Sequence, residues 1–501
     1  MSCVKQFHSR GAHLVLLWTC MLCTSIWLLF RLYRALFQGL KDMDTYYQLG
    51  LLPVVPLFIC APIPGWLADA KFGYFKVFRA ACCMLLIASI AGCISVLLLE
   101  SFKHETNTLS HVLSGGVAPM VYAIGLIGAT AGLMTALQVG LDQMQDASAT
   151  NITSFITWFV FSIFAGCWLA DVLYTWLTSC NTNWTIQLFS LLPTICTSLT
   201  CCSIFLLPNK FLVTELQLPN AFKIIYQVLK FAVKNKAPIS RSSLTYWEED
   251  VPSRLDLGKT NYGGPFTTEQ VDDVKTFFKM LILLLPLLII SVATSSTQRL
   301  YMYSTFNMNN CTSQLVYNFS YSPWLSGIIA TIAYEFAIYP LIRNRLPSTL
   351  KQIGISSFLI TLGTVVYLIA TIITYFFSND TTIIKPSLHI AYCAFFGIAA
   401  VSIVNSMLKF VCAQSPYRMR GILTGSTILV FFISIALGVL LFTVFYSVCD
   451  VGYCDLIHTS ISTALSLIGL VLYCLLSRWY KWRVRDEDNL TIRTYVHSIN
   501  T

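Results

Sequence analysis

Apolar runs long enough to cross a lipid bilayer recur along the whole sequence, with short polar segments between them. An α-helix crosses the hydrocarbon core of a bilayer with about 20 apolar residues. The chain has 501 residues, of which 56% are hydrophobic and 11% charged, whereas about a quarter of an ordinary soluble domain is charged. A soluble fold of this size cannot bury so much apolar surface. We therefore expect twelve transmembrane helices, at residues 12–36, 46–66, 77–99, 116–139, 153–177, 185–207, 277–298, 322–342, 352–377, 387–411, 421–447 and 458–477.

The longest polar stretch, residues 209–276, leaves six expected spans on each side of it. It contains an amphipathic segment at 221–233, whose lysines suit anionic lipid headgroups, and the spacing of a helix capping box at 267–270. A six-plus-six arrangement is typical of secondary transporters. We expect an N-terminal six-helix bundle at 1–208, a cytoplasmic linker with an amphipathic helix at 209–276, a C-terminal six-helix bundle at 277–477 and a cytoplasmic tail at 478–501.

The distribution of lysine and arginine among the short loops predicts the orientation of the chain. These residues concentrate in the loops that share a side with both termini, and cytoplasmic loops carry the excess of positive charge. Both termini are therefore expected in the cytoplasm. Four Asn-x-Ser/Thr sites fall in loops expected outside, which favours the plasma membrane over an endosome or lysosome. These predicted glycosylation sites are Asn183, Asn310, Asn318 and Asn379.

Composition and motifs exclude several classes of function. The net charge is +9, but the basic residues lie between apolar runs and form no continuous stripe, so we expect no nucleic-acid partner. No catalytic triad, phosphate loop, dinucleotide fingerprint or zinc spacing occurs, so neither an enzyme nor a cofactor or metal is expected. Of the 18 cysteines, Cys449 and Cys454 share one loop expected outside; a local disulfide and two separate thiols are both open.

The loop between the second and third expected spans carries a recognisable motif. Residues 65–76 have the sequence GWLADAKFGYFK, which resembles the G-x-L-A-D-x-x-G signature of the major facilitator superfamily, with three residues instead of two between Asp69 and Gly73. Glycine permits a tight turn and close helix approach at Gly65 and Gly73, and Asp69 can lie at a helix end and pair with a base across the two halves. The resemblance implies a conformational latch formed by Gly65, Asp69, Gly73 and Lys76. An ordinary basic loop is the alternative.

Five further segments resemble the proton-dependent oligopeptide transporter family, a branch of that superfamily. The resemblance implies an all-α polytopic membrane protein with the major facilitator fold, in which 12 transmembrane helices form two six-helix bundles. It also implies transport of a small, peptide-like solute. In chain order these segments are WFVFSIFAG at 158–166, RSSLTYWE at 241–248, YGGPFTTEQVDDVK at 262–275, EFAIYPLIR at 335–343 and QSPYRMRG at 414–421.

The sequence departs from that family where its members carry the charges used for proton coupling and peptide binding. The family's Glu-x-x-Glu-Arg/Lys motif of the first span is absent, because the first glutamate of the chain is Glu100. The family's lysine of span four and glutamate of span ten fall at Leu133 and Ala400. Two acids lie within the expected spans, and such groups are usually functional in a bilayer. If protons are coupled to transport, Asp171 or Glu335 must carry them.

The missing charges suggest a solute cavity lined mainly by aromatic, hydroxyl and amide groups. For each aromatic residue, plain helix packing is the alternative, whereas a buried amide such as that of Asn405 needs a polar partner. Two arginines near the outer end of the first span are further candidates. The expected substrate path comprises Arg31, Arg34, Trp158, Phe161, Phe164, Thr294, Gln298, Tyr334 and Asn405.

Two classes of function remain open from the sequence. The first is a transmembrane transporter that moves a small organic solute, peptide-like or other, through the bilayer by alternating access. The second is a non-transporting solute sensor or partner-binding membrane protein on a carrier scaffold, which the loss of so many family charges suggests. Saturable flux of a solute would distinguish the first from the second.

Overall fold

A computed structural model describes the helical core of the chain. The described residues are 10–38, 62–101, 118–144, 147, 149–179, 185–206, 221–235, 253–306, 323–342, 347–376, 384–416, 419–448 and 454–480. Nearly all of them are helical, and within these ranges the one β-type contact is an isolated bridge between Lys259 and Phe266. Helices suit a bilayer because they satisfy every backbone polar group within the segment.

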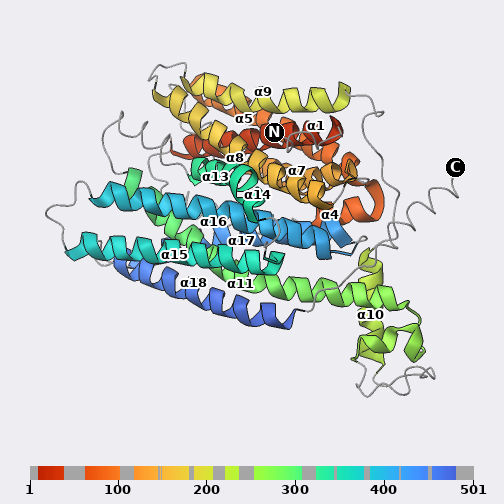
Figure 1. Cartoon of the computed structure of the whole chain (residues 1–501). Helices are drawn as coiled ribbons and strands as arrows, with labels where there is room; N and C mark the ends of the chain where they lie inside the picture. The colour runs from red at the N-terminus through yellow and green to blue at the C-terminus, as the bar shows by residue number, and fades with distance from the viewer. Residues whose placement is uncertain are drawn as a thin grey trace.

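The N-terminal half forms one packed group of helices, in red to yellow in Figure 1, around a shared apolar core. Its long helices are α1 (Arg10–Gln38), α5 (Tyr74–Ser101), α7 (Ala118–Asp142), α8 (Ala149–Ser179) and α9 (Thr185–Leu206). The short α4 (Pro62–Leu67) and the π-helix η3 (Ala68–Phe72) lead into α5.

The C-terminal half forms a second group with its own core, in green to blue in Figure 1. Its long helices are α11 (Thr268–Phe306), α15 (Thr349–Phe376), α16 (Ile384–Gln414), α17 (Arg420–Val448) and α18 (Cys454–Trp479). The segment at 323–342 is broken into α13 (Pro323–Ala333), the π-helix η8 (Tyr334–Ile338) and α14 (Tyr339–Ile342).

Ten of the described helical segments are long and apolar enough to span a membrane, and α9 contributes a shorter apolar stretch, Leu191–Leu206. Each expected span coincides with a helix, except that the span at 46–66 lies mostly outside the described residues. The all-helical fold class is confirmed. The domain boundaries at 208/209, 276/277 and 477/478 stay predictions, and α11 already begins at Thr268, inside the expected linker.

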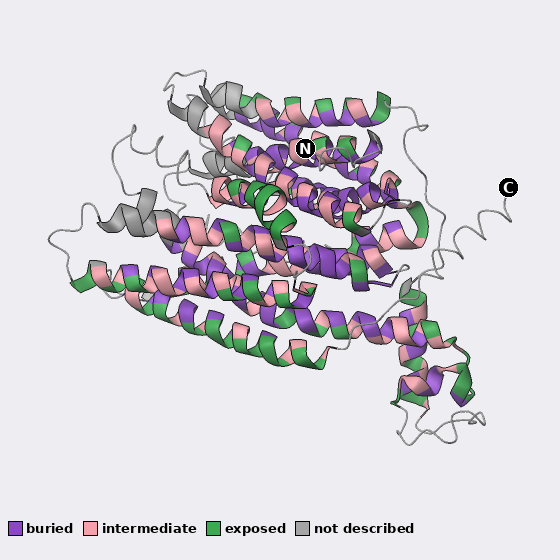
Figure 2. Cartoon of the chain, viewed as in Figure 1, coloured by how far each residue is buried: buried purple, intermediate pink, exposed green. Residues whose placement is uncertain are grey.

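Figure 2 shows that the long helices carry both buried and exposed residues along their length. Many large apolar side chains are exposed, and many small hydroxyl residues are buried. On α18, Ser462 and Ser466 are fully buried while Leu467 and Ile468 are about half exposed. Small polar residues let helices approach closely inside a membrane, and apolar side chains face the lipid tails. This pattern identifies the outer surface of the bundles as the lipid contact.

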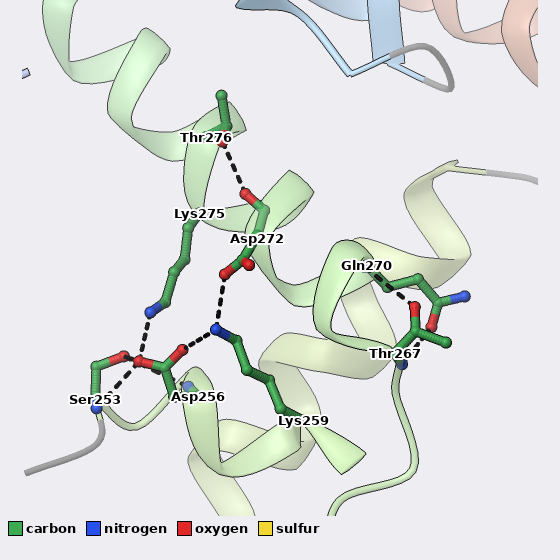
Figure 3. A network of polar contacts seen from close by, with 8 residues as sticks. All are labelled: Ser253, Asp256, Lys259, Thr267, Gln270, Asp272, Lys275 and Thr276. Carbon is green, nitrogen blue, oxygen red and sulfur yellow. Dashed lines mark hydrogen bonds and ion pairs between the residues drawn. The ribbon is translucent and has the colours of Figure 1, made fainter. Parts of the chain in front are cut away.

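The linker folds onto the start of α11, at the same end of the molecule as α4 (Figure 1). Its amphipathic helix α10 (Ala221–Lys234) buries Ile225 and Val228 against Val271 and Val274. The expected capping box is confirmed, because the Thr267 hydroxyl accepts the Gln270 backbone N–H at 3.3 Å and the Gln270 side-chain oxygen accepts the Thr267 backbone N–H at 3.2 Å (Figure 3). Because the sequence predicts a cytoplasmic linker, we call this end of the molecule the inner end.

Candidate functional site

The two bundles touch at the inner end through two glycines. A Cβ atom on Gly65 would lie 2.3 Å from the backbone oxygen of Gly421, and a Cβ atom on Gly421 would lie 2.6 Å from that of Gly65. No other residue type fits this backbone-to-backbone approach without a shift. The glycine of the loop motif therefore allows α4 and the start of α17 to meet.

Asp69 reinforces this contact from the π-helix η3. Its carboxylate accepts the backbone N–H groups of Gly421 at 3.2 Å and Ile422 at 3.1 Å, and it also accepts the hydroxyl of Tyr74. Because α17 begins at Arg420, these N–H groups belong to the first turn, which has no carbonyl partners within the helix. A carboxylate at this position also interacts favourably with the helix dipole. Asp69 thus joins the N-terminal bundle to a helix of the C-terminal bundle.

The structure places the other members of the predicted latch as follows. Gly73 has a φ of 76°, a left-handed conformation that favours glycine, and it ends η3. Lys76 is exposed at the start of α5. The partners of Asp69 given above are backbone N–H groups and a hydroxyl, and the pairing with a base that the sequence suggested stays a prediction. We define the inner contact as Gly65, Asp69, Gly421 and Ile422.

A second polar contact lies nearby, between α7 and α17. The Gln138 side-chain amide donates a hydrogen bond to the Thr424 hydroxyl at 2.8 Å, and both side chains are buried. Thr424 lies one turn into α17 from the inner contact. The N-terminal and C-terminal bundles are therefore joined by hydrogen bonds over the first turns of α17.

Helix α8 of the N-terminal bundle meets the C-terminal bundle through hydroxyl groups. The Ser154 hydroxyl donates to the carboxylate of Glu335, and the Thr157 hydroxyl donates to the Asn405 side-chain oxygen at 3.4 Å. Asn405 is buried and has the polar partner that its amide requires. Glu335 lies on the π-helix η8, and such π-turns often occur at functional sites.

Lys409 completes this region from α16. Its side chain is 8% exposed, and its ammonium group lies 5.3 Å from the centre of the Tyr334 ring, a cation–π geometry. The Glu335 carboxylate lies near enough to attract the Lys409 charge. Lys409 is thus buried at the contact between bundles, and we call Tyr334, Glu335 and Lys409 the Lys409 cluster.

Toward the other end of the molecule, an aromatic contact joins the two bundles. The Trp324 ring of α13 packs edge-on against Trp27 of α1 and Phe164 of α8, with ring centroids 5.3 Å apart in both pairs. The Trp27 indole N–H donates to the Asp171 carboxylate at 2.5 Å. Asp171 therefore holds Trp27 from within the N-terminal bundle. We call Trp27, Phe164 and Trp324 the tryptophan contact.

The remaining residues of the predicted path are dispersed. Trp158 packs against Phe161 at 5.2 Å and Phe336 at 6.2 Å between ring centroids, so α8 and η8 share an aromatic surface. The Thr294 hydroxyl donates to the Ile290 carbonyl of its own helix at 3.0 Å, and Gln298 is half-buried one turn further along α11.

Several predicted features fall outside the described part of the structure. Arg31 and Arg34 lie on α1, but their side chains are not among the described ones. Cys449 is outside the described residues, and Cys454 is buried at the first residue of α18, so the disulfide stays a prediction. The same holds for the glycosylation sites, because Asn183, Asn310, Asn318 and Asn379 are also outside.

Two membrane-spanning helical bundles that meet at polar contacts define a carrier of the major facilitator type. The model of the POT family matches residues 82–430, and the chain belongs to that family. It is therefore a multi-pass transmembrane transporter of small solutes and not an enzyme.

Solved structures of carriers share this fold at low sequence identity. The POT family transporter PepTSo is 13% identical, with a TM-score of 0.64 over 94% of this chain and 98% of that chain. An auto-inhibited POT family peptide transporter is 14% identical, with a TM-score of 0.62 over 95% of this chain and 98% of that chain. The proton:xylose symporter XylE of the major facilitator superfamily is 12% identical, with a TM-score of 0.56 over 91% of this chain and 94% of that chain.

Proposed function

We propose that this protein carries a small organic solute, peptide-like or other, across the plasma membrane by alternating access, with both termini in the cytoplasm. The observation that supports this most strongly is the Asp69 carboxylate of one bundle bound to the first N–H groups of α17 in the other. Alternating access requires two bundles that separate at one end while they touch at the other. A contact made of a few exchangeable hydrogen bonds at the inner end suits this motion.

The inner contact and the tryptophan contact would act as the two gates. A hydrogen bond to a charged group contributes about 1.5–3 kcal/mol, and an aromatic pair contributes about 0.5–1.5 kcal/mol beyond the area it buries. The hydrogen bonds of the inner contact and the ring pairs of the tryptophan contact are therefore each strong enough to hold a gate and weak enough to let it open. A solute shifts the balance only by as much as it binds one state better than the other. The surface between the gates, along α8, η8 and α16, is the proposed solute path.

Proton coupling is not part of the proposal, because the family's coupling motif of the first span is absent from the sequence. Asp171 accepts a hydrogen bond from Trp27 within the same bundle, whereas Glu335 accepts one from Ser154 across the two bundles. If mildly acidic medium stimulates uptake, we assign the proton to Glu335, because a proton there changes the contact that must open. Acid stimulation that survives Glu335→Gln would contradict this assignment.

An untargeted comparison of metabolites tests the transport proposal. Cells that express the full chain and cells with an empty vector are incubated in a defined metabolite mixture, and their contents are compared. We expect at least one small organic solute to differ, with saturable flux of that solute in proteoliposomes. A solute that raises the melting temperature of the purified protein but shows no flux would contradict transport and support a sensor.

A further inference from the structure

One cation is buried at the contact between bundles without an ion pair. The Lys409 side chain is 8% exposed, and among the described residues no carboxylate oxygen lies within 4.0 Å of its ammonium nitrogen. Nor does Lys409 donate a hydrogen bond to any side chain or carbonyl that the structure describes. An ammonium group has three donors. A charged group buried within a membrane protein is energetically costly and usually marks a functional site.

The position of Lys409 on its helix directs it toward the other bundle. Val401 and Leu408 of α16 belong to the apolar core of the N-terminal bundle, while Met407 and Phe410 belong to that of the C-terminal bundle. Residues four apart share a helix face, and four residues before Lys409 is Asn405, which accepts a hydrogen bond from Thr157 of α8. Lys409 therefore lies along the boundary between the two bundles.

The neighbours of Lys409 leave its hydrogen-bonding capacity unused. The Ser154 hydroxyl of α8 donates to one oxygen of the Glu335 carboxylate, and Tyr334 offers its ring face rather than an acceptor oxygen. Phe336, which follows Glu335, packs edge-on against Trp158 and is 54% exposed. The surroundings thus combine one cation with an aromatic surface.

We propose that Lys409 is the recognition site for an oxyanion of the carried solute, a carboxylate borne on an apolar or aromatic body. This inference rests on the proposed transport function and names its substrate class. The anion binds the ammonium group by charge-assisted hydrogen bonds, and the apolar body packs against Trp158 and Phe336. Trp158 lies on α8 of one bundle and Lys409 and Phe336 on α16 and η8 of the other. When the bundles separate, the solute therefore loses the contacts to one side and its binding weakens.

A matched pair of probes tests the anion site. Phenylacetate and phenylacetamide have the same aromatic body and differ in charge. The melting temperature of the purified full-length protein in lipid nanodiscs is measured against the concentration of each probe, for the wild type, Lys409→Gln, Lys409→Arg and the control Lys351→Gln. Lys351 is an exposed lysine of α15 in the same bundle.

We expect the acid to bind the wild type and Lys351→Gln at least about tenfold more tightly than the amide, because one charge-assisted hydrogen bond is lost with the amide. Lys409→Gln abolishes this preference and Lys409→Arg keeps it. The melting temperature without probe shows that each variant is folded. Equal binding of acid and amide to the wild type, no binding of either, or an unchanged preference in Lys409→Gln would overturn the inference.

Flux measurements separate this inference from the transport proposal. Saturable proteoliposome flux that is equal for acid and amide would overturn the anion site and leave transport standing. A preference for the acid that depends on Lys409, without flux of either probe, would leave the site standing and contradict transport.

Discussion

Asp69 joins the two bundles through a single carboxylate, and its charge can be removed with little change of shape. An acid at a helix N-terminus contributes about 0.3–2 kcal/mol. Asp69→Asn keeps the acceptor oxygen but loses the charge, so the closed state of the inner end becomes less populated. We expect a cysteine placed at the buried Ala68, in a variant without native cysteines, to react with a thiol reagent about fivefold faster, since 1 kcal/mol corresponds to about that factor.

The control for this prediction is Asp455→Asn. Asp455 also lies in the first turn of a helix, α18, but at the start of the last helix and not at the inner contact. An equal effect of both changes, or no effect of Asp69→Asn, would contradict the assigned role of Asp69.

The substitution Gly65→Ala tests the inner contact through the size of a side chain rather than through its charge. The Cβ atom of Gly65→Ala would lie 2.3 Å from the Gly421 oxygen, so α4 and α17 cannot meet without a shift of backbone. We expect loss of solute uptake and fast labelling of the cysteine at position 68. In the control Gly354→Ala, the new Cβ atom meets the Tyr473 ring at 3.4 Å, an ordinary contact, and uptake is retained. Normal uptake by Gly65→Ala would show that the close approach is dispensable.

Individual residues of the site differed in how far the sequence predicted them. The glycines and the aspartate of the loop motif have special backbone or capping requirements, which leave a recognisable spacing in the sequence. Lys409 left no such signal, because α16 is apolar on most of its surface and hydropathy does not show which face meets the other bundle. The sequence signal that could have found it is Asn405, four residues earlier, since a buried amide marks a face with polar partners.

At the scale of elements, the linker is held to α11 by a network of charges (Figure 3). The Asp256 carboxylate accepts hydrogen bonds from Lys275 at 2.5 Å and Ser253 at 2.6 Å and pairs with Lys259 at 2.9 Å. Partial burial would raise the pKa of the Asp256 carboxyl, but the bonds from Lys275, Ser253 and Lys259 outweigh burial and hold the pKa well below its usual range. The charged form of Asp256 is therefore the one that stabilises the segment.

The pH dependence of this network follows from the direction of these shifts. Because the folded pKa of Asp256 is lowered, its contribution is complete above the ordinary value of about 3.9 and is lost as the pH falls toward the lower folded value. Burial lowers the pKa of Lys259, but its bonds with Asp256 and Asp272 raise it overall, so its contribution is lost only as the pH rises above about 10.4. We expect circular dichroism of an isolated 221–300 peptide in micelles to show a plateau between these limits. Loss of the helical signal near neutral pH would show that the ion pairs of Asp256 and Lys259 do not stabilise the segment.

Asp256→Asn tests the network at neutral pH. Loss of hydrogen bonds to a charged group destabilises the segment locally by about 1–3 kcal/mol, so amide hydrogen exchange at 253–262 should accelerate at least about fivefold. Glu269→Gln changes an exposed acid in the first turn of α11 and should leave this exchange unchanged. Amide exchange at the wild-type rate in Asp256→Asn would show that Asp256 does not stabilise residues 253–262.

The capping box at the start of α11 is expected to have a smaller effect on local stability, which amide hydrogen exchange can also measure. Thr267→Ala removes the hydroxyl that caps the Gln270 N–H, and loss of such a cap costs about 1 kcal/mol. Exchange of the first-turn amides of α11 should become about fivefold faster, whereas Thr268→Ala leaves the cap in place. Equal exchange in the two variants would argue against the capping role.

The sequence predicted those helices that are determined by the length of an apolar run or by the spacing of capping residues. Apolar runs predicted the long helices, and the capping box predicted where α11 begins. The break of residues 323–342 by the π-helix η8 was not predicted, because one extra residue in a helical turn leaves the hydropathy of a span unchanged. Tyr334 and Glu335 of the Lys409 cluster lie within this break. The sequence therefore named these two residues as candidates but did not predict the local backbone that positions them.

At the scale of the whole molecule, the division into two bundles followed from the polar stretch between two sets of six apolar runs. Which helices meet across the bundles did not follow from the sequence. The structure pairs α8 with α13 and α16, and α17 with α4 and α7. Most spans are apolar on every side, so the lipid face and the face toward the other bundle have the same composition. The polar residues within the spans help to distinguish the two faces, and they became informative once their partners were known.

The central claim is that the two bundles separate at the inner end during each transport cycle. Gln138 and Thr424 lie across this boundary within hydrogen-bond distance. In a variant without native cysteines, Gln138→Cys and Thr424→Cys are joined by a short bifunctional thiol reagent, and uptake of the transported solute is measured before and after reduction. We expect the joined protein to lose uptake and reduction to restore it, while either single cysteine variant is unaffected. Full uptake by the joined protein would contradict the account.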